Sequence, residues 1–442
     1  MGIKVAKFGG SSVADAIQIN KIKNIVDADE TRRYIIVSAP GKRFDNDSKV
    51  TDLFYSCMMY KEHNLPFDHL FQVIWDRFKA LAMNLKVGGD IDREFEIIKE
   101  SINQGTTHDY LASRGEYLNG KLIAEFLGME FVDAAQVVKF DNRGKFLLEE
   151  TNEALKERLK NIDKALIPGF YGAKPDGSIK TFSRGGSDIT GALVARAVNA
   201  EVYENWTDVS GFLMADPRII DNPEPIEFIS YSELRELAYM GASVLHEDAI
   251  YPAKVGNIPI NIRNTNLPDD KGTIISDDLS KCQSRVVTGI AGNKDFTVLA
   301  IFKNRLSQER GFIRRMAGIL EDMDIPLEHM PSGIDTLSIV MQTSSIDGRI
   351  DELVERVENE LKVDRVEVVD NIALVATVGS GMSSRLGVSA KLFTALAEAK
   401  INIRMIDQGS SEINIITGVE NKDFERAVKA IYDAFHEEKI SR

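Results

Sequence analysis

The chain has 442 residues, of which 43% are hydrophobic and 28% charged, and its formal net charge is −14. This length accommodates two or three domains with large cores. The acidic balance argues against nucleic acid or an anionic membrane surface as the main partner, so an acidic ligand must meet locally concentrated cations. Two cysteines, Cys57 and Cys282, without metal-ligand spacing predict neither a disulfide framework nor a zinc site. Because the sequence has no signal-peptide pattern and no apolar run of membrane-spanning length, we expect a cytoplasmic protein.

The amino-terminal segment predicts a strand, a glycine-rich turn and a helix. Residues 3–8 form an apolar run that contains Lys7 near its end, Gly9 and Gly10 break the run, and an amphipathic pattern starts at Asp15. A lysine where a strand meets a Gly-Gly turn suits a phosphate cradle, although by itself such a lysine more often marks the exposed end of a strand. The segment is neither a Walker A loop nor a GxGxxG dinucleotide fingerprint.

The first ~280 residues alternate strand-like runs with helical patterns, and this alternation predicts an α/β domain with a mostly parallel sheet. Further strands are expected at 34–37, 164–168, 200–204 and 258–262. The long helical pattern of residues 53–128 predicts a helical flank. Strand ends that are followed by glycine-rich turns are where ligands bind in such folds.

The most informative stretch, residues 182–188, reads FSRGGSD and runs directly into a helical pattern. Gly185 allows the backbone to approach a ligand, and the start of a helix offers free N–H groups and a positive dipole end. Arg184 adds a fork for carboxylate or phosphate, and Asp188 suits a metal ion or a lysine. The stretch predicts an anion site, and the glycine turn at the amino terminus favours this interpretation over a plain turn.

Several other residues allow both a functional and a structural interpretation. Glu116 can accept hydrogen bonds from a substrate ammonium, complete a helix-capping box, or do both. Thr207, Asp208 and Arg218 lie in turn-rich segments that line a nucleotide pocket or only shape a loop. We interpret His246 as structural. No activated nucleophile stands out, and a carboxylate substrate needs none because its own oxygen can attack phosphorus.

Residues 264–284 are rich in proline, glycine and aspartate and predict a domain boundary. Beyond it the apolar pattern repeats at a shift of about 76 residues, which places Gly311 on Gly387 and Leu327 on Ile403. Each copy predicts a strand, a glycine-started helix, two strands and a helix.

The two copies differ in how they close. The first copy has a final strand at 363–369, whereas the second copy lacks its last strand. An orphan strand-like run at 285–291 would complete the sheet of the second copy. This predicts two intimately joined ferredoxin-like modules, with the first inserted within the second.

Taken in order, these motifs resemble aspartokinase, of the amino-acid-kinase superfamily, over nearly the whole chain. The matching segments are KFGGSSVAD at 7–15, SRGGSD at 183–188, WTDVSG at 206–211, DPR at 216–218, GASVLH at 241–246 and the ACT-like stretch 387–412.

The resemblance implies a three-layer αβα amino-acid-kinase fold with a mostly parallel sheet over residues 1–282. Two ferredoxin-like βαββαβ ACT modules would follow over 283–442, the first (296–369) inserted in the second (283–292 plus 371–442). It also implies ATP- and Mg²⁺-dependent phosphorylation of the side-chain carboxylate of L-aspartate to 4-phospho-L-aspartate. This is the first step toward lysine, threonine and methionine, inhibited by feedback through the ACT modules. Because the chain ends after the second module, we expect a monofunctional enzyme.

The resemblance further assigns residues. Lys7 would stabilise the transferring phosphoryl group, and Asp188 would organise lysine and metal; no residue is expected to be a dedicated metal ligand. Glu116 would take the α-ammonium of aspartate and Arg184 its carboxylate. The aspartate-binding positions would be Ser38, Thr51, Glu116, Phe170, Arg184, Gly185 and Ser187. The nucleotide-binding positions would be Lys7, Gly9, Gly10, Ser11, Thr207, Asp208, Leu213, Arg218 and Ser243.

Three departures from the family pattern stand out. The loop 38–52 is longer and more charged than the family's Ser-Ala-x-x-Gly-x-Thr-Asn loop, so that spacing does not fix the match of Thr51. Ser243 stands where many members have a nucleotide-contacting lysine, and Leu213 stands where a tyrosine is common. The last two departures would leave Lys7 and Arg218 more of the nucleotide charge and would weaken ATP binding.

In the first ACT copy, the resemblance places Leu306, Gly311, Phe312, Leu327 and Glu328 at an effector pocket, with Glu328 receiving an effector ammonium. Lysine is the expected inhibitor, with threonine or no effector as alternatives. ACT modules usually pair across a twofold axis, so we expect a homodimer or a dimer of dimers.

Two other functions stay open. One is a kinase of the same fold for another substrate, such as glutamate, an acetylated amino acid, carbamate or a nucleotide; such kinases generally lack the ACT pair. The other is a non-catalytic amino-acid sensor on the same fold. Loss of Lys7 or Asp188 would favour the sensor, and both residues are present.

Overall fold

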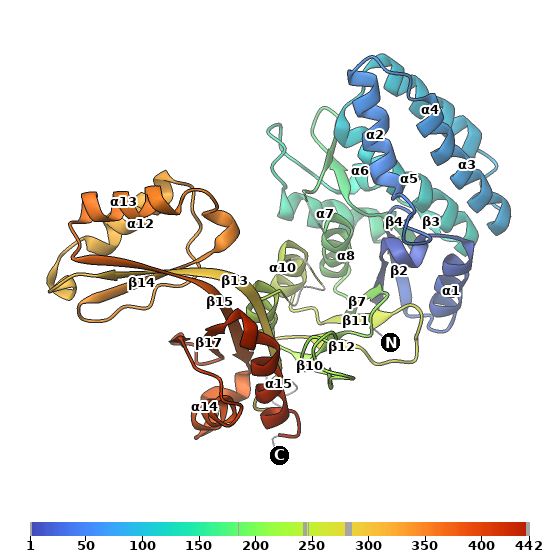
Figure 1. Ribbon diagram of the computed structural model, residues 1–442. Helices are drawn as coiled ribbons and strands as arrows, with labels where there is room; N and C mark the ends of the chain where they lie inside the picture. Colours follow the sequence, from blue (N-terminus) through green and yellow to red (C-terminus); the bar gives the residue numbers. More distant parts are fainter. Residues whose placement is uncertain (1, 184, 242–244, 246, 279–284, 439–442) are drawn as a thin grey trace. The chain divides into compact units, whose positions relative to one another are not determined.

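The computed structural model describes residues 2–183, 185–241, 245, 247–278 and 285–438, and the chain divides into two compact units (Figure 1). The first unit comprises Met1–Phe212, Pro225–Tyr231 and Val244–Leu279. The second comprises Leu213–Glu224, Ser232–Ser243 and Ser280–Arg442.

The first unit is built on an eight-stranded sheet in the order β10-β12-β11-β7-β1-β2-β4-β3. All neighbours run parallel except β11 and β12. The predicted mostly parallel sheet is thereby confirmed. The strands are β1 (Lys4–Phe8), β2 (Arg32–Val37), β3 (Glu130–Phe131), β4 (Ala165–Pro168), β7 (Val202–Thr207), β10 (Phe228–Ile229), β11 (Ile260–Asn264) and β12 (Thr273–Ile275). Two short strands, β5 (Tyr171–Ala173) and β6 (Ile179–Thr181), form a separate hairpin.

Helices enclose this sheet on both faces, which confirms the three-layer αβα architecture. On one face, α8 (Gly186–Ala197) lies against β1, β2 and β7 and is flanked by α7 (Leu148–Leu159) and α10 (Glu247–Val255). The other face packs against α1 (Ala16–Asp27) and α5 (His108–Leu127). Three further helices pack outside these, as Figure 1 shows: α2 (Val50–Glu62), α3 (Asp68–Leu85) and α4 (Ile91–Gln104).

The helical flank predicted for 53–128 is confirmed as α2–α5, and its aromatic residues are core. Phe71, Phe78 and Phe95 are fully buried, and the Phe71 and Phe78 rings contact Phe95 in edge-to-face and tilted arrangements. In α1 the amphipathic pattern that starts at Asp15 buries Ile19 and its helical neighbours, whereas Ile17 is 71% exposed. Ile17 lies two residues before Ile19, on the opposite side of the helix.

The second unit is built on a five-stranded antiparallel sheet in the order β14-β13-β15-β17-β16. Its strands are β13 (Gly289–Phe302), β14 (Thr336–Gln342), β15 (Arg365–Val378), β16 (Met405–Asp407) and β17 (Asn414–Glu420). The start of β13, 289–293, pairs with 374–378, whereas its end, 296–302, pairs with β14 and with 365–372. The two modules therefore share two long continuous strands.

Each module of the second unit has its own helices and core. In the first, α12 (Phe312–Asp322) and α13 (Ile350–Leu361) cover a core with β13 and β14; in the second, α14 (Val388–Glu398) and α15 (Phe424–Phe435) do so with β15 and β17. One predicted strand is wrong: near 325–330 the chain forms only isolated bridges, such as His329 with Val340. Among the described residues, no helix has the length and apolarity needed to cross a membrane.

Two short strands and a helix contain, or directly follow, points where the chain passes between the units. These are β8 (Phe212–Leu213), β9 (Pro225–Ile226) and α9 (Tyr231–Tyr239). The first unit also contains the single helical turn α6 (Ala134–Val137).

Candidate active site

The carboxyl ends of the central strands are joined by backbone hydrogen bonds into one edge. The Gly9 amide donates to the Trp206 carbonyl at 3.0 Å, and the Ser38 amide donates to the Phe8 carbonyl at 3.2 Å. The Gly169 amide likewise donates to the β2 carbonyl of Val37 at 3.0 Å. The segments that follow β1, β2, β4 and β7 therefore lie side by side, at the edge where open parallel sheets bind ligands.

Lys7, Asp188 and Asn205 form a buried polar group at this edge. Side chains alternate along β1, so Ala6 and Phe8 enter the core on one face while Lys7 points toward α8 on the other. There its Nζ lies 2.5 Å from Asp188 Oδ1, and its side chain is only 9% exposed. Asn205 stands beside Lys7 in the β1–β7 register and donates to the same carboxylate oxygen at 2.9 Å.

The turn after β1 is closely packed at Gly10, whereas Gly9 has ordinary contact distances. A Cβ on Gly9 would lie 3.5 Å from Lys7 Nζ, and one on Gly10 would lie 3.3 Å from the Ala39 carbonyl oxygen. Gly41 closes the turn from the other side, because its amide donates to the Gly10 carbonyl at 2.9 Å. The predicted residue Ser11 is exposed on this turn. Gly41 was not predicted; its only signal was its position in the loop after β2.

Replacing Gly41 by alanine is expected to open this turn. The new Cβ would lie 2.6 Å from the carbonyl carbon and oxygen of Gly10, which are backbone atoms that cannot rotate away. We expect KM for ATP to rise at least about tenfold and the free energy of unfolding to fall by about 1–3 kcal/mol. Steady-state kinetics and thermal unfolding measure both. The matched control is Gly89→Ala, where an added Cβ meets nothing within 4 Å; an equal effect there would contradict the prediction.

The second glycine turn begins α8. Gly185 has φ 58°, in the left-handed region that glycine tolerates, and it directly precedes the helix. A Cβ on Gly186 would lie 2.7 Å from the Phe170 ring, and one on Gly169 would lie 2.6 Å from Ser187. Phe170 itself has φ 80° and is held by its amide, which donates to Thr190 Oγ1 at 3.3 Å. The helix thus presents its first N–H groups at the same edge as Lys7.

Glu116 lies fully buried on α5, against the Ser38–Ala39 segment. Its Oε2 has no hydrogen-bond partner among the described residues. Burial raises the pKa of Glu116 to about 8. A buried carboxylate without a cation is costly, so this side chain suits a ligand that brings an ammonium group.

Asn119, one helical turn after Glu116, is a residue that the sequence did not single out. Its Nδ2 donates to the Ser38 carbonyl at 2.7 Å, and its buried Oδ1 is unpartnered within the described ranges. Two buried acceptors without donors thus lie on one helix that packs against consecutive residues of the strand-end segment. A lone asparagine in a helix carries no sequence signal for such a role.

The long loop 38–52 is anchored by Arg77, also not predicted. Its guanidinium donates to the carbonyls of Ala14, Gly41 and Ser48, of which the last lies at 3.0 Å. The loop leads into α2, where Thr51 Oγ1 is 3.8 Å from the position that a Cβ on Gly115 would take. Thr51 therefore lies next to the residue before Glu116.

The remaining nucleotide positions are placed less completely. Thr207 ends β7, and its hydroxyl donates to the exposed Asp208 at 3.1 Å. Arg184 and Ser243, like His246 and Cys282, lie outside the described residues. Leu213 and Arg218 belong to the second unit. There the Arg218 side chain is 88% exposed and pairs with Asp216 at 2.6 Å.

The predicted effector residues lie in the first ACT module. Leu306 and Phe312 are buried in its core, and Gly311 starts α12 with φ 76°. Leu327 is 40% exposed. Glu328 accepts a hydrogen bond from the Tyr239 hydroxyl.

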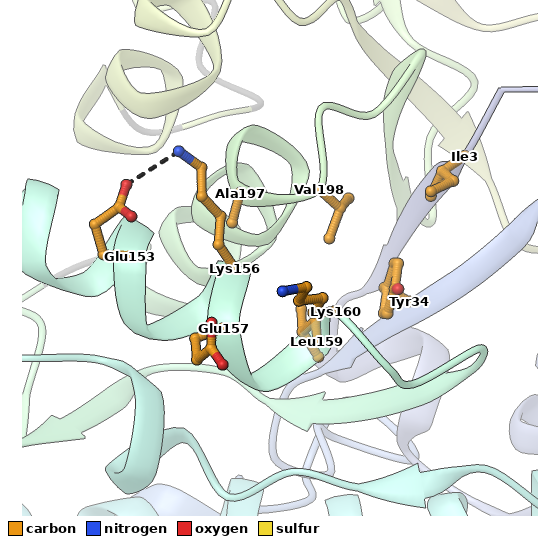
Figure 2. A pocket seen from close by; sticks show the side chains of 9 residues that line it. All are labelled: Ile3, Tyr34, Glu153, Lys156, Glu157, Leu159, Lys160, Ala197 and Val198. Atoms are coloured by element: carbon orange, nitrogen blue, oxygen red, sulfur yellow. Dashed lines mark hydrogen bonds and ion pairs between the residues drawn. The ribbon is translucent and has the colours of Figure 1, made fainter.

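A cavity of about 530 Å³ opens at the opposite, amino-terminal end of the sheet (Figure 2). Ile3 and Tyr34 line one side of it (Figure 2). Its walls also include four charged residues at or near α7, which are Glu153, Lys156, Glu157 and Lys160. Lys156 Nζ lies 3.0 Å from Glu153 Oε1, so these two charges neutralise each other. None of the predicted site residues lines this cavity, so we place the chemistry at the carboxyl edge.

Comparison with known proteins identifies the family. Residues 2–264 match the amino acid kinase family, and residues 375–435 match an ACT domain. The chain is 36% identical to aspartokinase 3 of Bacillus subtilis over 98% of both chains. Its structure is similar to the crystal structure of Clostridium acetobutylicum aspartate kinase, with a TM-score of 0.93, 51% identity and coverage of 98% and 100% of the two chains.

Similarity also extends to Escherichia coli aspartokinase III in complex with aspartate and ADP, with a TM-score of 0.71 and 28% identity over 98% of this chain and 99% of that one. The chain therefore belongs to the amino acid kinase family, within which it is an aspartokinase with ACT modules. The predicted resemblance and fold class are confirmed.

Proposed function

We infer that this chain transfers the γ-phosphoryl group of ATP to the side-chain carboxylate of L-aspartate, giving 4-phospho-L-aspartate and ADP. A carboxylate oxygen of aspartate forms a bond to the γ-phosphorus as the bond between that phosphorus and the β–γ bridging oxygen breaks. No protein nucleophile is required, so positioning and charge neutralisation carry the rate. The supporting observation is the buried Lys7–Asp188 pair between two glycine turns at the carboxyl edge.

The charge of each residue at this edge indicates its role in the proposed reaction. Lys7 neutralises charge on the transferring phosphoryl group, and Asp188 with Asn205 fixes the lysine in place. Backbone N–H groups at Gly9–Gly10 and at the start of α8 suit phosphate and carboxylate oxygens. Glu116 binds the ammonium of aspartate. Arg184 is proposed for its carboxylate, from the motif alone.

Mg²⁺ fits this donor set as a companion of the nucleotide. Within the described ranges no three acidic, histidine or cysteine side chains gather as a metal site. Mg²⁺ typically keeps several waters and uses one or two carboxylates besides substrate phosphates. Asp188 is the carboxylate at this edge that would contact it, and the ion would neutralise phosphate charge.

A coupled ADP-release assay tests the reaction. We expect ADP release with aspartate and ATP, and little with glutamate or without an acceptor. Preference for glutamate would indicate another kinase of this fold. Lack of turnover with retained amino-acid binding would indicate a sensor.

Lysine is the proposed inhibitor, acting through the first ACT module. Two likenesses support it: a lysine-sensitive aspartokinase 3 of E. coli at 28% identity, and the T-state structure of E. coli aspartokinase III with lysine and aspartate, with a TM-score of 0.74. By the internal repeat, Glu328 corresponds to Arg404 in the second module. At this position the first module offers an acid to an effector ammonium, whereas Arg404 of the second module would repel it.

Glu328→Gln is expected to weaken inhibition by lysine. Loss of one partner of a charge pair that is partly removed from water costs about 2 kcal/mol or more, or roughly 30-fold in binding. The readout is the lysine concentration for half-inhibition at fixed aspartate. The control is Glu321→Gln, on the same module in α12. If lysine leaves the native enzyme active up to millimolar levels, lysine is the wrong effector and threonine is tested in its place.

This proposal also includes three further properties: a cytoplasmic location, a role in lysine, threonine and methionine synthesis, and assembly as a homodimer or a dimer of dimers. They follow from the family resemblance and the ACT pair. The domain limits 1–282 and 283–442 also stay predictions of the sequence.

A further inference from the structure

Helix α9 begins in one unit and continues in the other. Its first residue, Tyr231, belongs to the first unit, where the hydroxyl donates to the Ile258 carbonyl at 3.1 Å. The following residues, from Ser232 on, belong to the second unit. Because a helix moves as a stiff element, a force on its last turn reaches its first turn.

Two side chains of α9 bind the second ACT module. The buried Glu233 accepts from Thr288 Oγ1 at 2.7 Å and from the Ser380 amide at 2.6 Å. Glu236, three residues later on the same helix face, accepts from Asn414 Nδ2 at 2.5 Å. These hydrogen bonds hold the helix against the end of β15 and the starts of β13 and β17.

One helical turn further, Tyr239 binds the first module. Its hydroxyl donates to Oε2 of Glu328. Burial, and then this hydrogen bond, raise the pKa of Tyr239, so the phenol remains a donor at physiological pH. Glu328 keeps free acceptor capacity, because a carboxylate has about four lone-pair sites. A ligand ammonium and the Tyr239 hydroxyl can therefore share the carboxylate.

We propose that Tyr239 is a residue of the regulatory site that connects the occupant of Glu328 to α9. The inference rests on the effector role proposed for Glu328. A cation bound at Glu328 draws charge from the oxygen that accepts from Tyr239 and weakens that hydrogen bond. The last turn of α9 thus has different contacts in the free and bound states, as coupling between two sites requires.

Tyr239→Phe removes only the hydroxyl from a residue that is 56% exposed, so the variant is expected to fold. We expect activity without effector within about twofold of native and lysine binding by calorimetry within about threefold, while the inhibition factor at saturating lysine falls at least about fivefold. The matched control is Tyr251→Phe, another exposed tyrosine, with 60% exposure. Lysine should inhibit this control variant as fully as it inhibits the native enzyme.

The outcomes separate this inference from the effector assignment. If Tyr239→Phe binds lysine and is inhibited as fully as the native enzyme, the link through Tyr239 is wrong, whereas a loss of lysine binding in Glu328→Gln still supports the assignment. If Tyr239→Phe has a lower melting temperature but unchanged inhibition by lysine, the link is also wrong, because that result indicates a tyrosine with a structural role only. If Glu328→Gln binds lysine normally, or if the native enzyme binds neither lysine nor threonine, the assignment fails and the inference fails with it.

Discussion

Lys7→Ala is expected to lower kcat by about 10²–10³-fold or more, because it removes the fixed cation aimed at the transferring phosphoryl group. The change also leaves Asp188 with Asn205 as its remaining partner among the described contacts. Breaking a buried ion pair costs about 3–5 kcal/mol of stability. Turnover and thermal unfolding must therefore be measured together.

Two further variants separate catalysis from folding. The double variant Lys7→Ala with Asp188→Asn removes both charges, so it should regain stability without regaining turnover. Lys4→Ala is the matched control on the same strand, since Lys4 pairs with Asp29 near the surface. Normal turnover in Lys7→Ala, or equal loss in Lys4→Ala, would contradict the assignment. Lysine binding should persist in Lys7→Ala.

Glu116→Gln is expected to raise KM for aspartate by about 10²-fold, because a neutral amide replaces the carboxylate that faces the substrate ammonium. In the native enzyme the pKa of Glu116 is raised to about 8 by burial. Only the ionised form attracts the ammonium, so kcat/KM for aspartate should rise with pH up to about 8. The variant should lack this rise.

The same substitution has the opposite effect on stability. The folded-state pKa lies above the ordinary value of 4.5, so the folded protein holds the proton more tightly. The contribution of protonated Glu116 to the free energy of unfolding is therefore fully present below pH 4.5 and is lost as the pH rises through about 8. Glu116→Gln should be more stable than the native enzyme at pH 9 by an amount on the order of a few kcal/mol, and equal to it at pH 4. Urea unfolding at both pH values measures this.

Glu125→Gln provides the control for both effects, since Glu125 is exposed on the same helix and accepts from the Gly88 amide at 2.9 Å. Parallel changes in Glu125→Gln would mean that α5, and not the buried carboxylate, is responsible. A pH profile of kcat/KM that is unchanged in Glu116→Gln would exclude Glu116 as the ammonium ligand.

The sequence predicted the αβα fold class and the family, because both follow from local patterns. Alternating apolar residues, helical periodicity and glycines at strand ends depend on neighbours a few positions apart. The internal repeat likewise required only self-comparison of the chain. Local patterns also failed in two places: the chain near 325–330 forms isolated bridges instead of the expected strand, and the apolar side chain of Ile17 faces solvent.

Which distant residues meet depends on the three-dimensional fold and could not be predicted from local patterns. Three contacts join parts of the chain that no local period relates. They are the pairing of Lys7 with Asp188, the closure of the Gly10 turn by Gly41, and the contact of Tyr239 with Glu328. These contacts depend on strand register and on which helix face packs inward, and both are set by the whole core. A residue such as Asn119 carries no pattern of its own and becomes recognisable when burial leaves its oxygen without a donor.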